Sequence, residues 1–323
     1  TPKGSGSSTE DLAYSIFEPD GARQLFPCND TPGDKATFSL VGRVPEGWIL
    51  ASNGLLTHSE ASEGEVAFHW SEDLPIATYL ITLNAGPYET WEEEGGAFPI
   101  VYYSRPAYRG SAELQWSRTP EQRALFARLF GPYPFGKYGT VEAPMPFAAM
   151  EHQALALWRT SLFTSLAGSP ERAWSITAHE AAHHWFGNLV TPTRWEEIWL
   201  NEGFATYGEA LWAEAEGGQA GLSEYMSTNN QVYILYKGYE ESGSLYDPYE
   251  LFGVTSYQKG AAVLHMARRL LGDEAFFAGI NDYLDAHAYG NATTEDLRAA
   301  FEGASGRDLG PFFDHWVYRA GQG

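Results

Sequence analysis

The segment His179-Glu180-Ala181-Ala182-His183 carries two histidines four residues apart, with a glutamate directly after the first. Side chains four residues apart lie on the same face of an α-helix, so both imidazoles can reach a single metal ion. Glu180 projects beside that face, where it can act as a base and not as a ligand. The five-residue pattern alone is only moderately specific, because short matches arise by chance.

Eighteen residues separate His183 from Glu202, which lies within residues 199–205 (WLNEGFA). We expect Glu202 on a second helix packed against the first. Two histidines and one glutamate leave the fourth position of a zinc ion open for water, which is the catalytic arrangement. The sequence therefore predicts one zinc ion held by His179, His183 and Glu202. His184 faces about 100° away around the helix and is not expected to be a ligand.

Helix signals surround these residues. Ser169-Pro170-Glu171 combines a capping residue with a first-turn proline, and predicts a helix that ends near Phe186, before Gly187. Thr119-Pro120-Glu121-Gln122 is a second helix start of this kind. Further helices are expected over residues 199–215, 260–271, 273–287, 294–304 and 309–318.

The first part of the chain has a different pattern. Short strand-like runs at residues 36–41, 48–50 and 78–83 are bounded by Gly, Pro and Asn, which predicts an antiparallel β-module. The acidic, glycine-ended segment at residues 89–96 (ETWEEEGG) marks a boundary. We expect strands before this segment and mostly helices after it.

The composition limits the function classes. Asp and Glu number 42 against 20 Lys and Arg, a formal net charge of −22, which argues against a nucleic-acid partner and favours cationic ligands such as a peptide ammonium. We find no apolar run of 18 or more residues, so no membrane span is expected. The only cysteine, Cys28, excludes an intrachain disulfide framework. We expect a soluble protein, in the cytoplasm in preference to a secreted or periplasmic location.

Residues 179–205 closely resemble the zinc-binding stretch of the aminopeptidase N family of gluzincins. Residues 26–30 with 35–38 resemble the family's N-terminal-domain signature. Residues 148–152 (AAMEH) occupy the place of its Gly-x-Met-Glu-Asn exopeptidase motif, with Ala148 for the Gly and His152 for the Asn. Residues 257–260 (YQKG) resemble the segment that bears its catalytic tyrosine.

The resemblance implies a zinc-dependent aminopeptidase whose partners are peptides with a free N-terminus. Glu180 is expected to accept a proton from the attacking water and to pass it to the leaving amine. Tyr257 is expected to donate a hydrogen bond to the developing oxyanion. Glu151 is expected to pair with the substrate ammonium. It lies in a substrate-binding segment that also contains Ala148, Ala149 and Met150.

The resemblance also implies an α+β fold. Residues 1–92 are expected to be the C-terminal part of an N-terminal antiparallel β-sandwich domain, and residues 93–323 a thermolysin-like catalytic domain. A separate N-terminal fragment of the same protein is one expected partner. We expect Lys137 to be structural. Glu209 lies seven residues after Glu202 on the same helical face, where it could orient a histidine ligand, but a surface position is the favoured interpretation. A zinc endopeptidase with the same metal site and a non-catalytic peptide-binding relative are the alternatives.

Overall fold

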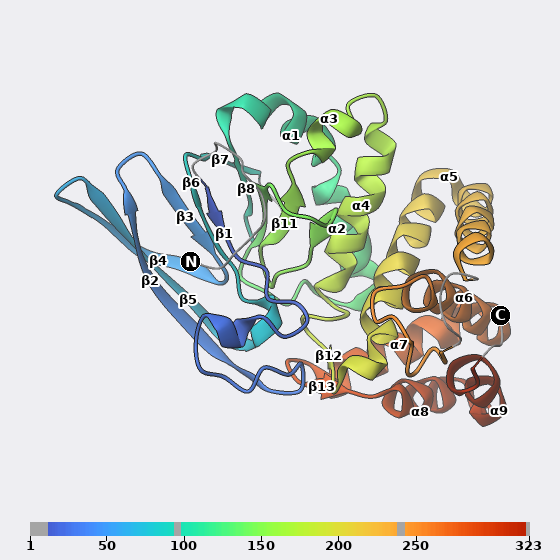
Figure 1. The fold of residues 1–323 in the computed structure, drawn as a ribbon. Coiled ribbons are helices and arrows are strands. Elements are labelled where there is room, and N and C mark those ends of the chain that lie inside the picture. Colours follow the sequence, from blue (N-terminus) through green and yellow to red (C-terminus); the bar gives the residue numbers. More distant parts are fainter. Residues whose placement is uncertain (1–11, 94–97, 238–242, 321–323) are drawn as a thin grey trace.

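The computed structural model describes residues 12–93, 98–237 and 243–320. Strands of the first 90 residues lie at one side of the molecule, and the helices of the C-terminal third lie at the other (Figure 1). A mixed sheet and the helix that bears both histidines lie between them (Figure 1). The predicted α+β class, with an N-terminal β-rich part and a helical catalytic part, is confirmed.

Two three-stranded antiparallel sheets form the N-terminal part. The first has the order β1-β6-β3 and the second the order β2-β5-β4. Their bounds are β1 Ala13–Tyr14, β2 Lys35–Pro45, β3 Ile49–Ser52, β4 Leu55–Ser62, β5 Glu65–Ala77 and β6 Leu83–Gly86. The predicted antiparallel β-module is therefore present.

One predicted strand, at residues 78–83, is wrong. Thr78–Leu80 is a turn of 3-10 helix, and β6 begins only at Leu83. Tyr79, Leu80 and Ile81 are all buried, so their side chains do not alternate between a core face and a solvent face as in a half-exposed strand. Tyr79 packs edge-on against Trp195, 5.0 Å between ring centres, so contacts with the second part of the chain override the local strand preference.

A five-stranded mixed sheet, of order β10-β11-β9-β8-β7, supports the site. The inner pairs β8–β9 and β9–β11 are parallel, while the edge strands β7 and β10 are antiparallel to their neighbours. The bounds are β7 Glu89–Glu93, β8 Ile100–Ser104, β9 Tyr138–Ala143, β10 Ala149–Met150 and β11 Ala156–Arg159. The domain division at residue 92 stays a prediction, and β7 spans that position.

The helices follow the predicted order. They are α1 Arg109–Gln115, α2 Thr119–Phe130, α3 Leu162–Ser165, α4 Pro170–His183, α5 Trp199–Tyr236, α6 Gly260–Leu271, α7 Asp273–His287, α8 Thr294–Ser305 and α9 Gly310–Phe313. Short 3-10 helices span Ala22–Gln24, Pro106–Tyr108 and Trp195–Glu197, and π-helices span Thr255–Lys259 and Asp314–Tyr318. β12 Thr191–Pro192 pairs in parallel with β13 Asn291–Ala292.

The helix predicted over residues 199–215 is present, and it is interrupted at Gly218, whose backbone (φ 61°, ψ −153°) is not helical; beyond this kink a second helical segment of α5 continues to Tyr236. One helix prediction needs correction. The helix predicted over residues 309–318 is a single α-turn followed by the π-helix at Asp314–Tyr318. Within the part of the chain that the structure describes, every helix is too short or too polar to cross a bilayer.

Close helix contacts hold the centre of the fold together. Gly203 of α5 faces Gly260 of α6, and a Cβ added at Gly203 would lie 3.0 Å from the Cα of Gly260. A Cβ added at Gly208 would lie 2.6 Å from the Cβ of Ala182 on α4. Small residues at both contacts therefore let α5 lie directly against its two neighbours.

We predict that Gly203→Ala destabilises the protein by about 1–3 kcal/mol, because the added methyl meets backbone that cannot rotate away. Gly303→Ala, on α8 with open space around its Cα, is the matched control, and we expect it to be neutral or stabilising by about 0.5–1 kcal/mol. Denaturant unfolding measures both changes. Equal stabilities for the two variants would contradict this account of the α5–α6 contact.

Candidate active site

Helix α4 presents its two histidines to the same cavity. Ala178, Ala181 and Ala182 are fully buried on the side that packs into the core. His179 and His183 line a cavity of about 510 Å³ beside β10 and α5. Their ring centres lie 4.6 Å apart, as residues one helical turn apart should. The small buried alanines are what allow the histidine face of α4 to approach α5.

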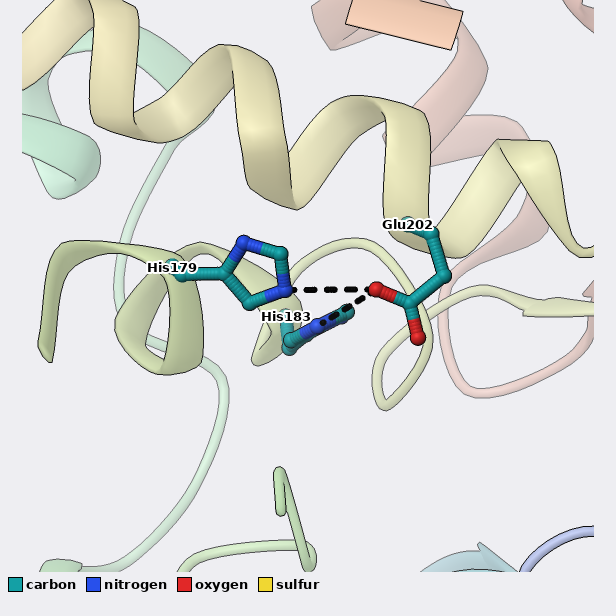
Figure 2. A group of neighbouring side chains, drawn as sticks. All are labelled: His179, His183 and Glu202. Carbon is teal, nitrogen blue, oxygen red and sulfur yellow. Dashed lines mark hydrogen bonds and ion pairs between the residues drawn. The ribbon is translucent and has the colours of Figure 1, made fainter. Parts of the chain in front are cut away.

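Glu202, near the start of α5, completes the group. Its Oε2 lies 3.2 Å from Nε2 of His179 and 3.5 Å from Nε2 of His183, so both imidazoles point at the same oxygen (Figure 2). Each of the three side chains has one potential ligand atom, and these three atoms lie within 4.8 Å of one another. Burial acts to raise the pKa of Glu202, but His183 and His179 outweigh it and lower that pKa to about 2.

This donor set fits zinc. Two imidazole nitrogens and one carboxylate oxygen are the protein ligands of one class of catalytic zinc sites. Both Nδ1 atoms are engaged elsewhere, which leaves both Nε2 atoms directed at the centre of the group. Glu180 Oε2 is also buried and has no hydrogen-bond partner among the described residues. A water held beside it would satisfy this oxygen.

Polar side chains around the three donors contact both imidazoles. Glu209 Oε1 lies 3.0 Å from His179 Nδ1, so the expected surface position of Glu209 is wrong. Asn201 Oδ1 lies 2.8 Å from His183 Nδ1, and Asn201 Nδ2 donates to Glu151 at 3.0 Å. Such contacts orient the imidazoles of metal sites. The spacing of Glu209 along the helix was the available signal, but the sequence does not reveal which helix faces it.

The structure brings both predicted catalytic residues into the same cavity. Burial raises the pKa of Glu180 to about 8, against the opposing effect of His179 and His183. Its carboxylate can therefore take up a proton near neutral pH. The Tyr257 ring is nearly parallel to that of His179, with 5.9 Å between their centres. Tyr257 lies in the π-helix Thr255–Lys259, and irregular helical turns of this kind are frequent at functional sites.

The predicted substrate segment forms one wall of the cavity. Ala148, Ala149, Met150 and Glu151 all line it, and β10 lies at the edge of the mixed sheet. Glu151 is buried, and its backbone oxygen accepts a hydrogen bond of 2.8 Å from Asn188. Glu151 thus lies one residue beyond the edge strand β10, with its side chain buried and not exposed to water.

Glu18 is a site residue that sequence reasoning missed. It comes from the N-terminal part, yet it lines the same cavity, and its carboxylate lies within 4.8 Å of those of Glu151 and Glu202. Its pKa is raised well above the usual value. Burial is the largest cause, and repulsion from Glu151, Glu202 and Glu180 adds to it. Its Oε1 is buried without a partner among the described residues. No motif singles it out, because only the packing of the two parts brings it here.

Comparisons with known proteins define the family. The model of the Peptidase family M1 domain matches residues 122–316, which is more than half of the chain. The model of the Peptidase M1 N-terminal domain matches residues 3–80. The chain therefore belongs to peptidase family M1, the family of aminopeptidase N, and the predicted family membership is confirmed.

Characterised relatives carry matching names. Aminopeptidase N of Streptomyces lividans is 32% identical over 330 residues, which cover 95% of this chain and 38% of the relative. Aminopeptidase M1 of Arabidopsis thaliana is 30% identical over 97% of this chain and 37% of the relative. The chain thus spans well under half the length of these relatives. Their names agree with the predicted aminopeptidase function.

Solved structures show the same fold. A mutant M1 zinc metallopeptidase of Deinococcus radiodurans bound to a Tyr-Ser-Ala substrate has a TM-score of 0.78 and 28% identity, over 95% of this chain and 69% of that one. A two-domain M1 zinc metallopeptidase mutant bound to L-arginine has a TM-score of 0.80 and 28% identity, over 97% and 70%. The β-rich part and the catalytic part are therefore arranged as in this family.

We predict that Glu209→Ala weakens zinc binding about 10–100-fold, because His179 loses the carboxylate that orients its ring. Glu216→Ala removes a carboxylate from the same helix, and the exposed ion pair that it makes with Arg118 lies away from the cavity. Competition with a chelator of known affinity measures the zinc dissociation constant of each variant. Equal affinities for the two variants would show that Glu209 does not support the metal site.

Proposed function

We propose that this protein is a zinc-dependent aminopeptidase, which hydrolyses the first peptide bond of peptides with a free N-terminus. The observation that carries the proposal is the position of two buried carboxylates, Glu18 and Glu151, beside the histidine–glutamate group in one cavity. A metal group alone fits any zinc peptidase. Carboxylates next to the metal group would form charge-assisted hydrogen bonds with the ammonium of a substrate's free N-terminus.

The proposed ligands of the zinc ion are His179, His183 and Glu202. Zinc supplies Lewis-acid chemistry when bound: it lowers the pKa of water and polarises a carbonyl oxygen. Glu209 and Asn201 hold the two imidazoles in place for this task. Asn201 also contacts Glu151, so one side chain links the orientation of a metal ligand to that of the ammonium site.

Glu180 is the proposed general base. Its Oε2 has no partner among the described residues, so it can accept a hydrogen bond, and then a proton, from a water molecule held beside it. In the proposed mechanism it takes a proton from the attacking water and gives it to the departing amine. Tyr257 donates its hydroxyl hydrogen to the oxygen of the scissile carbonyl as negative charge develops there.

Glu18 and Glu151 are the proposed ammonium-binding residues, and Ala148, Ala149 and Met150 form the adjoining substrate wall. Like charges at this separation repel each other, which is why neighbouring carboxylates contribute to the raised pKa of Glu18. A substrate ammonium relieves that repulsion and satisfies the unpartnered Glu18 oxygen. The pair lies directly beside the metal group, since one carboxylate oxygen of each lies within 4.8 Å of one of Glu202.

Glu180→Gln tests the proposed base. We expect the variant to retain zinc, because Gln fills the same space, and to lose at least about 100-fold in kcat, the scale of general-base catalysis. Steady-state kinetics with the zinc content measured on the same sample gives both values. A kcat close to that of the unsubstituted protein would exclude Glu180 as the base.

Glu18→Gln and Glu151→Gln test the ammonium site. Each is expected to lower kcat/KM for a free aminoacyl amide about 10–100-fold, since a charge-assisted hydrogen bond is lost. The unsubstituted protein is assayed on a panel of chromogenic aminoacyl amides, each beside its N-acetylated twin, which lacks the ammonium. Cleavage of the acetylated twins as fast as the free amides would favour the endopeptidase alternative instead.

A further inference from the structure

A second cavity, of about 270 Å³, lies between α5, α6 and the C-terminal π-helix. Much of its wall is apolar, with side chains from Met226, Ile234, Val263 and Met266. Its lining residues are all different from those of the cavity that holds the histidine pair. The volume lies just below the usual range for sites of drug-sized molecules, which suits a small ligand with a short apolar tail.

Lys259 also lines this cavity, and its ammonium group is unusual. The residue is 4% exposed. Among the described residues its Nζ has no hydrogen-bond or ion-pair partner, yet this atom is not completely enclosed by protein. The Lys259 ammonium therefore faces the open space of the cavity. A buried ammonium without a partner is destabilising, and a methionine would fill similar space without that cost.

The charges around the cavity favour an anion. Among the described residues, the cavity lining includes no aspartate or glutamate, although the whole chain has a net charge of −22. Asn230 and His265 add polar groups to the wall. Burial lowers the pKa of Lys259, and the nearby positive charge of Lys237 lowers it further, which shows that two like charges share this region.

Among the described residues, the Glu214 carboxylate lies close to the cavity wall, but Glu214 does not line the cavity. Glu214 interacts electrostatically with His265. Its two oxygens already accept hydrogen bonds of 2.6 and 3.0 Å from Arg268, which also binds Asp273. Arg268 therefore neutralises the charge of Glu214. Glu214 does not provide a negative partner for the Lys259 ammonium.

We propose that this second cavity binds a small monocarboxylate with an apolar tail. The carboxylate pairs with Lys259, and the tail packs against Met226, Val263 and Met266. A free amino acid fits less well, because the described lining residues offer no carboxylate to bind its ammonium. The proposal does not depend on the proposed function, since the two cavities share no lining residue, and either can fail without the other.

Isothermal titration of the zinc-loaded protein with octanoate tests the proposal, with octanamide as the neutral analogue. We expect octanoate to bind and octanamide to bind at least about tenfold more weakly, as a charge-assisted contact predicts. N-acetylleucine is a second probe. Tighter binding of octanoate identifies a free fatty acid as the ligand type, and tighter binding of N-acetylleucine identifies the carboxyl end of a peptide.

Three variants locate the site. Lys259→Met should weaken octanoate binding at least about tenfold while octanamide binding changes less than about twofold. Ala262→Phe fills the cavity and should abolish binding of both octanoate and octanamide. This variant provides the test if Lys259→Met does not fold. Arg269→Met removes an exposed positive charge from the same helix, outside the cavity, and should leave both affinities unchanged.

Three results would overturn the proposal. One is no octanoate binding at about 1 mM ligand. Another is equal affinity for octanoate and octanamide. The third is octanoate binding that persists in Lys259→Met and in Ala262→Phe, which places the carboxylate elsewhere, such as at the zinc ion.

Discussion

The packing of α4 against α5 is the contact on which the site depends. The histidines lie on the first helix and Glu202 on the second, so the three donor atoms meet only if the helices approach closely. Ala182 and Gly208 make that approach possible, since a methyl on the glycine would lie 2.6 Å from the alanine Cβ. Gly203, directly after Glu202, makes a second close contact with Gly260 of α6. The helix that contains Gly260 follows directly from the π-helix with Tyr257, so the same contacts position Tyr257, the proposed oxyanion donor.

Charge gives the cavity its selectivity. Glu18, Glu151 and Glu202 lie close together and largely buried, and their mutual repulsion is a cost that the fold must bear. The histidine pair offsets this cost at Glu202, whose pKa falls to about 2. Glu18 has no such neighbour among the described residues that brings its pKa down, which leaves it ready for a cationic ligand. The three neighbouring carboxylates therefore differ in their surroundings, and the proposed metal ligand and the proposed ammonium site use this difference.

Two lysines, buried Lys137 and half-buried Lys35, join the N-terminal sheets to the catalytic part. Lys137 donates to the backbone oxygen of Ser52 at 2.7 Å and to that of Gly54. Lys35, on β2, donates to the backbone oxygens of Asn188 and Leu189, at 2.8 and 3.1 Å. The second contact holds the loop that follows the histidine helix. The structural role expected for Lys137 is thus to bind the backbone of the N-terminal part. That part supports the site and also contributes Glu18 to it.

The sequence by itself determined the metal chemistry, because the histidines are four residues apart on one helix and this local spacing puts both rings on one face. It also determined the strand-then-helix order, since turn residues and helix caps act over a few positions. Tertiary structure alone decided the position of Glu18, the contact between Glu209 and His179, and the helical turn at residues 78–80. Each of these depends on burial or charge between segments far apart in the chain, and no local pattern records which distant segment will be the neighbour.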